Sequence, residues 1–190
     1  MRGLPKKIRA FIAVEIPEKV QSELIEIAAM FKPHINRASW VKQGNLHLTL
    51  KFLGDIESER IEEISSPLEE ISAEFAPFSI RFSDVGVFPD PRRPRVLWVG
   101  LGEGEKEMIR MANAIEEAME RLGFKRERRP FTPHLTLARI KGPSNLTGPL
   151  GDFRMPNLSP VRVAGFSLIR SQLDPKGAIY TRIREFNLRG

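Results

Sequence analysis

The sequence predicts a bilobal α+β fold, built from two pseudo-duplicated β-α-β units whose two antiparallel-rich sheets face a central cleft, with helices outside. Three observations support this prediction. The tetrapeptide His-Leu-Thr-Leu occurs twice, at 47–50 and at 134–137, with the two histidines 87 residues apart. Each copy lies in an apolar run with the alternation of a β-strand. Each copy also follows a strand and a helix, so that the segment 8–53 is repeated as the segment 95–140.

Composition describes an ordinary globular protein, which we expect to be one two-lobed domain over residues 1–190. The hydrophobic fraction is 41% and the charged fraction 28%. The net charge of +6 slightly favours polyanionic partners, and the absence of cysteine excludes disulfides and Cys-containing zinc sites. No apolar run has membrane-spanning length, and residues 1–10 lack the apolar core of a signal peptide. We therefore expect a cytoplasmic monomer with no membrane partner.

The first unit reads as strand, helix and strand. Pro17 suits the start of a helix because its missing N–H would be unpaired there anyway, and Glu18 in the first turn favours the helix dipole. In order, we expect a strand over 8–16, a helix ended by Pro33, a short connection over 39–41, and a strand over 45–53 closed by Gly54-Asp55.

The remaining elements follow from the same signals. Pro67 lies inside a helical pattern and predicts a kink or a restart. The segment 141–160 is rich in Gly, Pro and Asn and predicts a loop. In order, we expect a helix over 58–75, strands over 78–88 and 95–101, a helix from Gly104 to Gly123, a strand over 133–140, and strands over 161–173 and 179–187.

The repeated tetrapeptide carries residues suited to phosphate chemistry. In a strand, His47 and Thr49 point to one face and the leucines to the other, and the same holds for His134 and Thr136. Histidine, with a pKa of roughly 6.5, exchanges protons near neutral pH. One imidazole can accept a proton from an attacking water while the other donates one to the leaving oxygen. Threonine hydroxyls can bind the phosphate oxygens. This scheme requires no metal and no cofactor.

Basic and aromatic residues near the motifs are candidates for substrate contacts. Arg129 ends a basic segment, 125–129, that leads into the second motif. Arg139 follows that motif, and Lys51 occupies an equivalent place after the first. These cations can form a phosphate-binding rim of the kind that RNA-binding proteins use. Phe11 can stack on a base, although packing in the core is the alternative.

Other patterns predict no site. Glycines in the segment 100–105 match neither the dinucleotide-binding spacing nor the P-loop spacing, and the neighbouring glutamates would repel phosphate. Three dispersed histidines, of which His34 lies outside any pattern, do not have the spacing of a zinc site.

The chain resembles the two-histidine (2H) phosphoesterases over nearly its whole length. The resemblance rests on two His-x-Thr-x motifs, the opening strand Arg-Ala-Phe-Ile-Ala at 9–13, Phe-Leu-Gly at 52–54 and Pro133 before the second motif. Within that group the chain is most similar to the RNA 2′,3′-cyclic phosphodiesterases, also called 2′-5′ RNA ligases, of bacteria and archaea.

The resemblance implies hydrolysis of a terminal RNA 2′,3′-cyclic phosphate to a 2′-phosphomonoester, with reversible, ATP-independent 2′-5′ ligation. It implies that His47 is the proton donor, His134 the proton acceptor, and that Thr49 and Thr136 hold the phosphate oxygens. The sequence itself leaves donor and acceptor interchangeable. The partner implied is an RNA with a 2′,3′-cyclic phosphate end, with tRNA fragments among the candidates.

Two alternatives remain at this stage. A binding module with the same fold would hold a nucleotide or RNA end without turnover. A different 2H phosphodiesterase would act on another cyclic phosphate or on 2′-5′ oligonucleotides, a choice made by cleft loops. A metal-dependent hydrolase is a more distant third.

Overall fold

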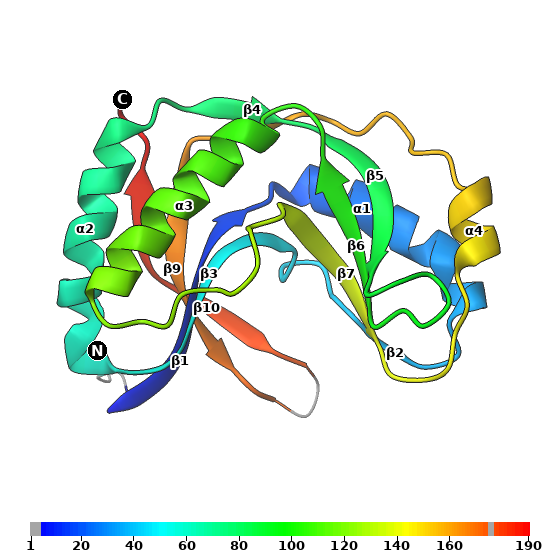
Figure 1. Ribbon diagram of the computed structural model, residues 1–190, viewed down its shortest axis with the longest axis horizontal. Coiled ribbons are helices and arrows are strands. Elements are labelled where there is room, and N and C mark those ends of the chain that lie inside the picture. Colours follow the sequence, from blue (N-terminus) through cyan, green and yellow to red (C-terminus); the bar gives the residue numbers. More distant parts are fainter. Residues whose placement is uncertain (1–4, 175–176) are drawn as a thin grey trace.

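The computed structural model describes residues 5–174 and 177–190 (Figure 1). Its strands are β1 (Lys7–Glu15), β2 (Ala38–Trp40), β3 (His47–Glu57), β4 (Phe78–Ile80), β5 (Phe82–Phe88), β6 (Val96–Leu101), β7 (His134–Ile140), β8 (Val161–Val163), β9 (Gly165–Gln172) and β10 (Ile179–Asn187). Its α-helices are α1 (Glu18–Phe31), α2 (Ile61–Glu74), α3 (Glu105–Arg121) and α4 (Thr147–Asp152), and the 3-10 helices are η1 (Lys32–His34) and η2 (Ser58–Arg60).

The two units have the same construction. In the first, β1 pairs with β3 in antiparallel fashion and α1 lies between them in sequence. In the second, β6 pairs with β7 and α3 lies between them. Pro17 precedes α1 with a φ of −57°, as the start of a helix favours. Gly104 precedes α3 with a φ of 76°, and a Cβ there would lie 2.3 Å from the carbonyl oxygen of Ser79, so only glycine fits.

The strands form an antiparallel sheet of two halves, which confirms the predicted α+β class. One half has the order β10-β9-β1-β3 and the other the order β7-β6-β5, with β2 also paired to β7. A smaller sheet contains β4 and β8. The two halves are joined between β3 and β7 by one register pair, Leu48 with Leu135. Figure 1 shows them diverging from this seam, so the two expected sheets meet along one edge.

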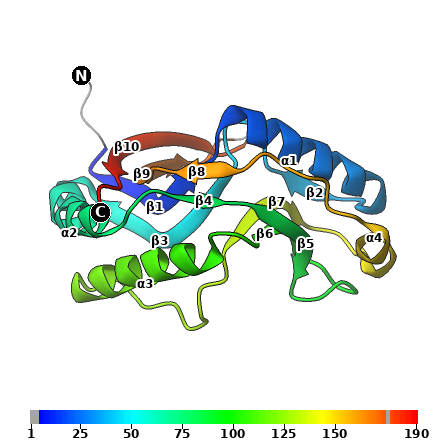
Figure 2. The ribbon, with the colours of Figure 1, turned by 90° about the horizontal axis from the view of Figure 1, so that it is seen from above.

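The helix of each unit packs against the motif strand of the other unit. Helix α1 contacts β7, and α3 contacts both β3 and α2 (Figure 2). The leucines of both tetrapeptides, at 48, 50, 135 and 137, are at most 5% exposed and belong to the main apolar core. Burying the leucines beneath helices from opposite units leaves the histidines and threonines on the other face of the sheet.

Each motif strand contains a bulge at the last leucine of its tetrapeptide. In β3, Thr49 and Lys51 face consecutive residues of β1, which leaves Leu50 as the extra residue. In β7, Thr136 and Ala138 face consecutive residues of β6, which leaves Leu137 as the extra residue. A bulge of one residue reverses the alternation of faces beyond it. The residues after each tetrapeptide are therefore oriented opposite to a regular strand.

Several elements differ from the expectation in detail. Strand β3 does not close at Gly54 but passes through a second bulge there, with a φ of 73°, and continues to Glu57. Pro67 does not interrupt α2, whose buried face packs it against the core on both sides of the proline. The connection at 39–41 contains β2, and the expected loop over 141–160 contains α4. None of the helices within 5–174 and 177–190 is long and apolar enough to cross a membrane.

Candidate active site

Two rows of residues cross the sheet at the seam, where four strands lie in the order β1-β3-β7-β6. The first row is Glu15, His47, Thr136 and Trp98, and the second is Ala13, Thr49, His134 and Gly100. The seam pair Leu48–Leu135 in antiparallel register places each histidine beside the threonine of the other motif. Diagonal neighbours on such strands are about 7–8 Å apart. A single phosphate that accepts hydrogen bonds of about 2.8 Å from residues on both sides fills a gap of this width.

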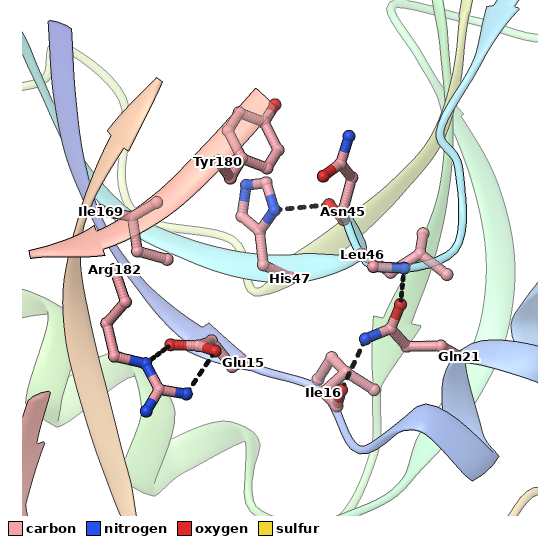
Figure 3. A pocket seen from close by; sticks show the side chains of 10 residues that line it. Glu15, Ile16, Gln21, Asn45, Leu46, His47, Ile169, Tyr180 and Arg182 are labelled. Carbon is pink, nitrogen blue, oxygen red and sulfur yellow. Dashed lines mark hydrogen bonds and ion pairs between the residues drawn. The ribbon is translucent and has the colours of Figure 1, made fainter. Parts of the chain in front are cut away.

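His47 is held by the backbone carbonyl of Asn45 and the ring of Tyr180, both drawn in Figure 3, and also by the ring of Phe11. Its Nδ1 lies 2.8 Å from the carbonyl oxygen of Asn45. Its ring centroid is 4.8 Å from that of Phe11 and 5.2 Å from that of Tyr180, which meets it edge-on at 88°. These contacts from β1 and β10 fix the plane of the imidazole.

His134 is held in the same way by different residues. Its Nδ1 lies 2.7 Å from the carbonyl oxygen of Thr132. The ring of Phe88 meets it edge-on, with centroids 5.1 Å apart at 89°, and Trp98 lies at 6.4 Å. The second unit therefore reproduces the support of the first with residues from β5 and β6.

The two backbone contacts determine which ring nitrogen remains free for proton transfer. A carbonyl oxygen only accepts hydrogen bonds, so Nδ1 of each histidine carries the proton and donates it. In both cases the acceptor lies two residues before the histidine. The Nε2 of each ring is left to accept a proton when the imidazole is neutral, or to donate one when it is charged.

Charged residues around His47 influence its protonation. Burial lowers the pKa of His47, while the Asn45 carbonyl and the Glu15 carboxylate raise it and Arg139 lowers it. Glu15 itself accepts two hydrogen bonds from Arg182, at 2.8 and 2.7 Å, and these bonds lower the Glu15 pKa. Because burial is the largest influence, the structure favours a neutral His47 when the site holds no anion.

Lys51 does not lie where we expected it. The bulge at Leu50 turns its side chain into the protein, where it is 2% exposed. Its Nζ forms an ion pair of 2.7 Å with Glu116 of α3 and donates to the carbonyl oxygen of Lys125, also at 2.7 Å. The prediction that Lys51 contacts the substrate phosphate is therefore wrong. The next residue, Phe52, lies on the side of the histidines instead and is 53% exposed.

The bulge in β7 likewise changes the orientation of Arg139 and places it on the side of the histidines. Regular alternation from His134 would turn Arg139 toward the core, but the bulge at Leu137 leaves it exposed. Its charge influences the pKa of both His47 and Tyr180. Arg139 is therefore positioned near the first motif, although it follows the second in sequence.

Phe11 and Arg129 have different environments. Phe11 is 3% exposed, because the rings of His47, Phe52 and Tyr180 surround it. It supports His47 from the floor of the site and has no free face for a base, so its assignment as a stacking residue is wrong. Arg129 is exposed and lines a groove beside β3 together with Phe52.

Sequence reasoning missed the residues that support the two imidazoles. Tyr180, Phe88 and Trp98 come from strands far from the motifs in sequence, so only the order of strands in the sheet brings them to the histidines. Burial raises the pKa of Tyr180, which keeps its phenol protonated. Within the described ranges, no group of three or more His, Cys, Asp or Glu side chains gathers in a way that could hold a metal ion.

Comparison with known proteins identifies relatives over almost the whole chain. The family model described as LigT like Phosphoesterase matches residues 14–98 and 99–180, so each match contains one tetrapeptide. The RNA 2′,3′-cyclic phosphodiesterase of Methanothermobacter thermautotrophicus is 34% identical over 185 residues, which covers 96% of this chain and 100% of the relative. That of Thermus thermophilus is 36% identical over 192 residues, with 96% and 91% covered.

Solved structures with the same fold also cover almost the whole chain. The crystal structure of TT0787 from Thermus thermophilus has a TM-score of 0.79 and 32% identity, covering 96% of this chain and 99% of that one. Escherichia coli LigT complexed with 3′-AMP has a TM-score of 0.76 and 25% identity, with 97% and 99% covered. The family match, the long alignments and the shared fold agree, and the chain belongs to the LigT-like phosphoesterase family.

Proposed function

We propose that this chain hydrolyses the 2′,3′-cyclic phosphate at the end of an RNA to a 2′-phosphomonoester with a free 3′-hydroxyl. The observation that carries the proposal is the antiparallel seam, which places each histidine beside the threonine of the other motif. Relatives named RNA 2′,3′-cyclic phosphodiesterase support the choice of reaction, as does the 3′-AMP complex of E. coli LigT for a nucleotide ligand.

The residues divide the reaction as follows. His134 Nε2 accepts a proton from water, whose oxygen attacks the phosphorus. The bond from phosphorus to O3′ breaks, and His47 Nε2 donates the proton that O3′ requires. Thr49 and Thr136 donate hydrogen bonds to the non-bridging oxygens, where charge accumulates in the transition state. Arg139 adds a positive charge beside this position.

The donor role assigned to His47 depends on the substrate. Burial lowers the pKa of His47 and favours its neutral form. An anionic cyclic phosphate in the site opposes that effect, because a nearby negative charge stabilises the imidazolium. In the alternative, His134 is the proton donor and His47 the proton acceptor. The rate of hydrolysis should have a bell-shaped pH dependence with either assignment.

The same site also supports joining of RNA ends. A 5′-hydroxyl in place of water attacks the phosphorus, the bond to O3′ breaks, and a 2′-5′ phosphodiester results. The phosphoanhydride of ATP is not needed, because the strained cyclic phosphate is the activated group. We propose a single two-lobed domain that works as a cytoplasmic monomer, without metal, on RNA ends such as those of tRNA fragments.

The test uses an RNA that ends in a 2′,3′-cyclic phosphate, incubated with EDTA and without ATP. We expect a product with the phosphate on O2′. His47→Ala and His134→Ala should each lower kcat at least about 10²-fold, the usual contribution of a general acid or base. His34→Ala is the matched control, because His34 is exposed in η1 and should keep full activity.

Three results would contradict the proposal. A 3′-phosphate product would mean that the other bond breaks. Near-normal activity in either motif variant would remove that histidine from the mechanism. Tight binding of the RNA end without turnover would favour a binding module instead.

A further inference from the structure

A groove of about 560 Å³ lies beside β3 and is lined in part by Phe52, which contacts Phe11 beneath His47. Residues 52–54 of β3 form one wall, and residues 124–129, which follow α3, form the other. This volume is within the range of about 300–1,000 Å³ typical of ligand sites. Neither motif contributes a side chain to the groove, so the proposed reaction does not account for it.

An exposed aromatic residue connects the groove with the site. Phe52 is 53% exposed, and its ring centroid is 6.1 Å from that of Phe11. Phe11 in turn packs at 4.8 Å from the ring of His47. The aromatic surface under His47 therefore continues outward to Phe52. An exposed ring beside a nucleotide site is a platform on which a base can stack.

The opposite wall carries unneutralised positive charge. Of the residues from Lys125 to Arg129, four are cationic and one is Glu127. Arg126 is paired with Glu120 at 2.8 Å. Arg128 and Arg129 are exposed and have no ion-pair partner in the part of the chain that the structure describes. Two arginines facing an aromatic ring across an open groove complement an extended polyanion that carries bases.

The basic segment is held in place from below. Lys51 Nζ donates to the carbonyl oxygen of Lys125, and the Glu116 carboxylate accepts a hydrogen bond of 2.8 Å from the backbone N–H of Glu127. Lys51 and Glu116 are also paired with each other. The segment then continues to Thr132, whose carbonyl orients His134. One connection thus supplies both the exposed arginines and the support of a histidine.

We infer that this groove binds the single-stranded RNA immediately 5′ of the terminal nucleotide, with a base stacked on Phe52 and phosphates bound by Arg128 and Arg129. The inference rests on the proposed function, since it takes the cyclic phosphate to lie at the histidines. The charge and the ring favour RNA over an apolar or acidic protein segment as occupant. The groove then gives a preference for oligonucleotides over mononucleotides.

The test compares kcat/KM for pentauridylate ending in a 2′,3′-cyclic phosphate with kcat/KM for 2′,3′-cyclic UMP. Phe52→Leu keeps an apolar side chain but removes the ring. It should lower the oligonucleotide-to-mononucleotide ratio about 5- to 150-fold, the range for one stacked base. Phe52→Trp should retain the preference. Met30→Ala, which changes an apolar side chain of α1 that is 58% exposed, is the matched control and should leave the ratio unchanged.

The double variant Arg128→Gln/Arg129→Gln tests the charged wall. The control is Arg162→Gln, which changes an exposed arginine of β8. The double variant should also lower the ratio. It should reduce the slope of log Kd for the oligonucleotide against log salt by about 1.4, or roughly 0.7 per phosphate contact. When the unmodified protein turns over both substrates, the inference stands if both Phe52→Leu and the double variant lower the ratio, and any other result overturns it.

Failure of the proposed function can be distinguished from failure of the groove. If neither substrate is turned over, the proposed reaction is wrong. Fluorescence anisotropy with pentauridylate ending in a 3′-phosphate then tests the groove without catalysis. Weaker binding in both variants supports the groove, and unchanged binding in either one overturns it.

Discussion

Replacing Lys51 by methionine tests whether the buried ion pair stabilises the connection between β3 and α3. The Lys51 side chain is 1% exposed, and that of Glu116 is 14% exposed. Lys51→Met removes two hydrogen bonds of 2.7 Å, one to Glu116 and one to the carbonyl oxygen of Lys125. It leaves the Glu116 carboxylate largely buried, with the N–H of Glu127 as its remaining donor.

The structure sets the expected size of the effect. Removing one partner of a buried pair costs roughly 3–5 kcal/mol, because the other charge is left without compensation. Glu116 keeps some exposure and one hydrogen bond, so we expect the lower end, about 3 kcal/mol. For a chain of this length, each kcal/mol lowers Tm by about 2–4 °C. Lys51→Met should therefore lower Tm by about 6–12 °C.

Urea unfolding followed by circular dichroism measures the loss directly. Lys51→Met/Glu116→Leu should recover most of it, because no unpaired charge remains buried. Lys7→Met is the matched control: its pair with Glu57 spans 3.5 Å and is exposed, so the change should stay within about 0.5 kcal/mol. A loss below 1 kcal/mol for Lys51→Met, or a double variant as unstable as the single one, would refute the reasoning.

Three further predictions concern the pKa of His47, the hydroxyl of Thr136 and the space at Gly86. NMR titration of the ligand-free protein should give His47 a pKa below about 6.5, because burial favours the neutral ring, and addition of inorganic phosphate should raise that pKa. Thr136→Val should lower kcat for the cyclic phosphate about 10²-fold, as loss of one transition-state donor does, with little change in stability. Gly86→Ala places a Cβ 2.3 Å from the Trp98 ring and should reduce the free energy of unfolding by about 1–3 kcal/mol, whereas Gly148→Ala, which has open space, should not.

Local patterns predicted most of the helices and strands and the buried face of each motif strand. The leucines of the tetrapeptides alternate with His and Thr, and the structure buries the leucines as predicted. The order of strand, helix and strand around each tetrapeptide was also predicted, as β1, α1 and β3 and as β6, α3 and β7. The alternation of side chains and the order of elements both depend on short stretches of sequence, so they could be predicted without knowledge of the fold.

The positions just after each motif could not be predicted in this way. A bulge depends on how one strand pairs with its neighbour, and nothing in the sequence around Leu50 or Leu137 indicates an extra residue. Regular alternation therefore assigned Lys51 to the wrong face and gave no reason to select Phe52. The partners of the histidines, such as Tyr180, depend on the order of strands, which is set by packing over the whole chain.

The antiparallel placement of two identical motifs has a consequence for reversibility. A group that donates a proton in one direction of a reaction must accept it in the other, so in the proposed mechanism the two imidazoles exchange roles when hydrolysis runs in reverse. Rotation by half a turn maps each motif onto the other, and each ring meets the same hydroxyl neighbour. In the proposed mechanism the two histidines alone thus give the reaction no direction, and the unequal surroundings contributed by the two units determine which ring is charged first.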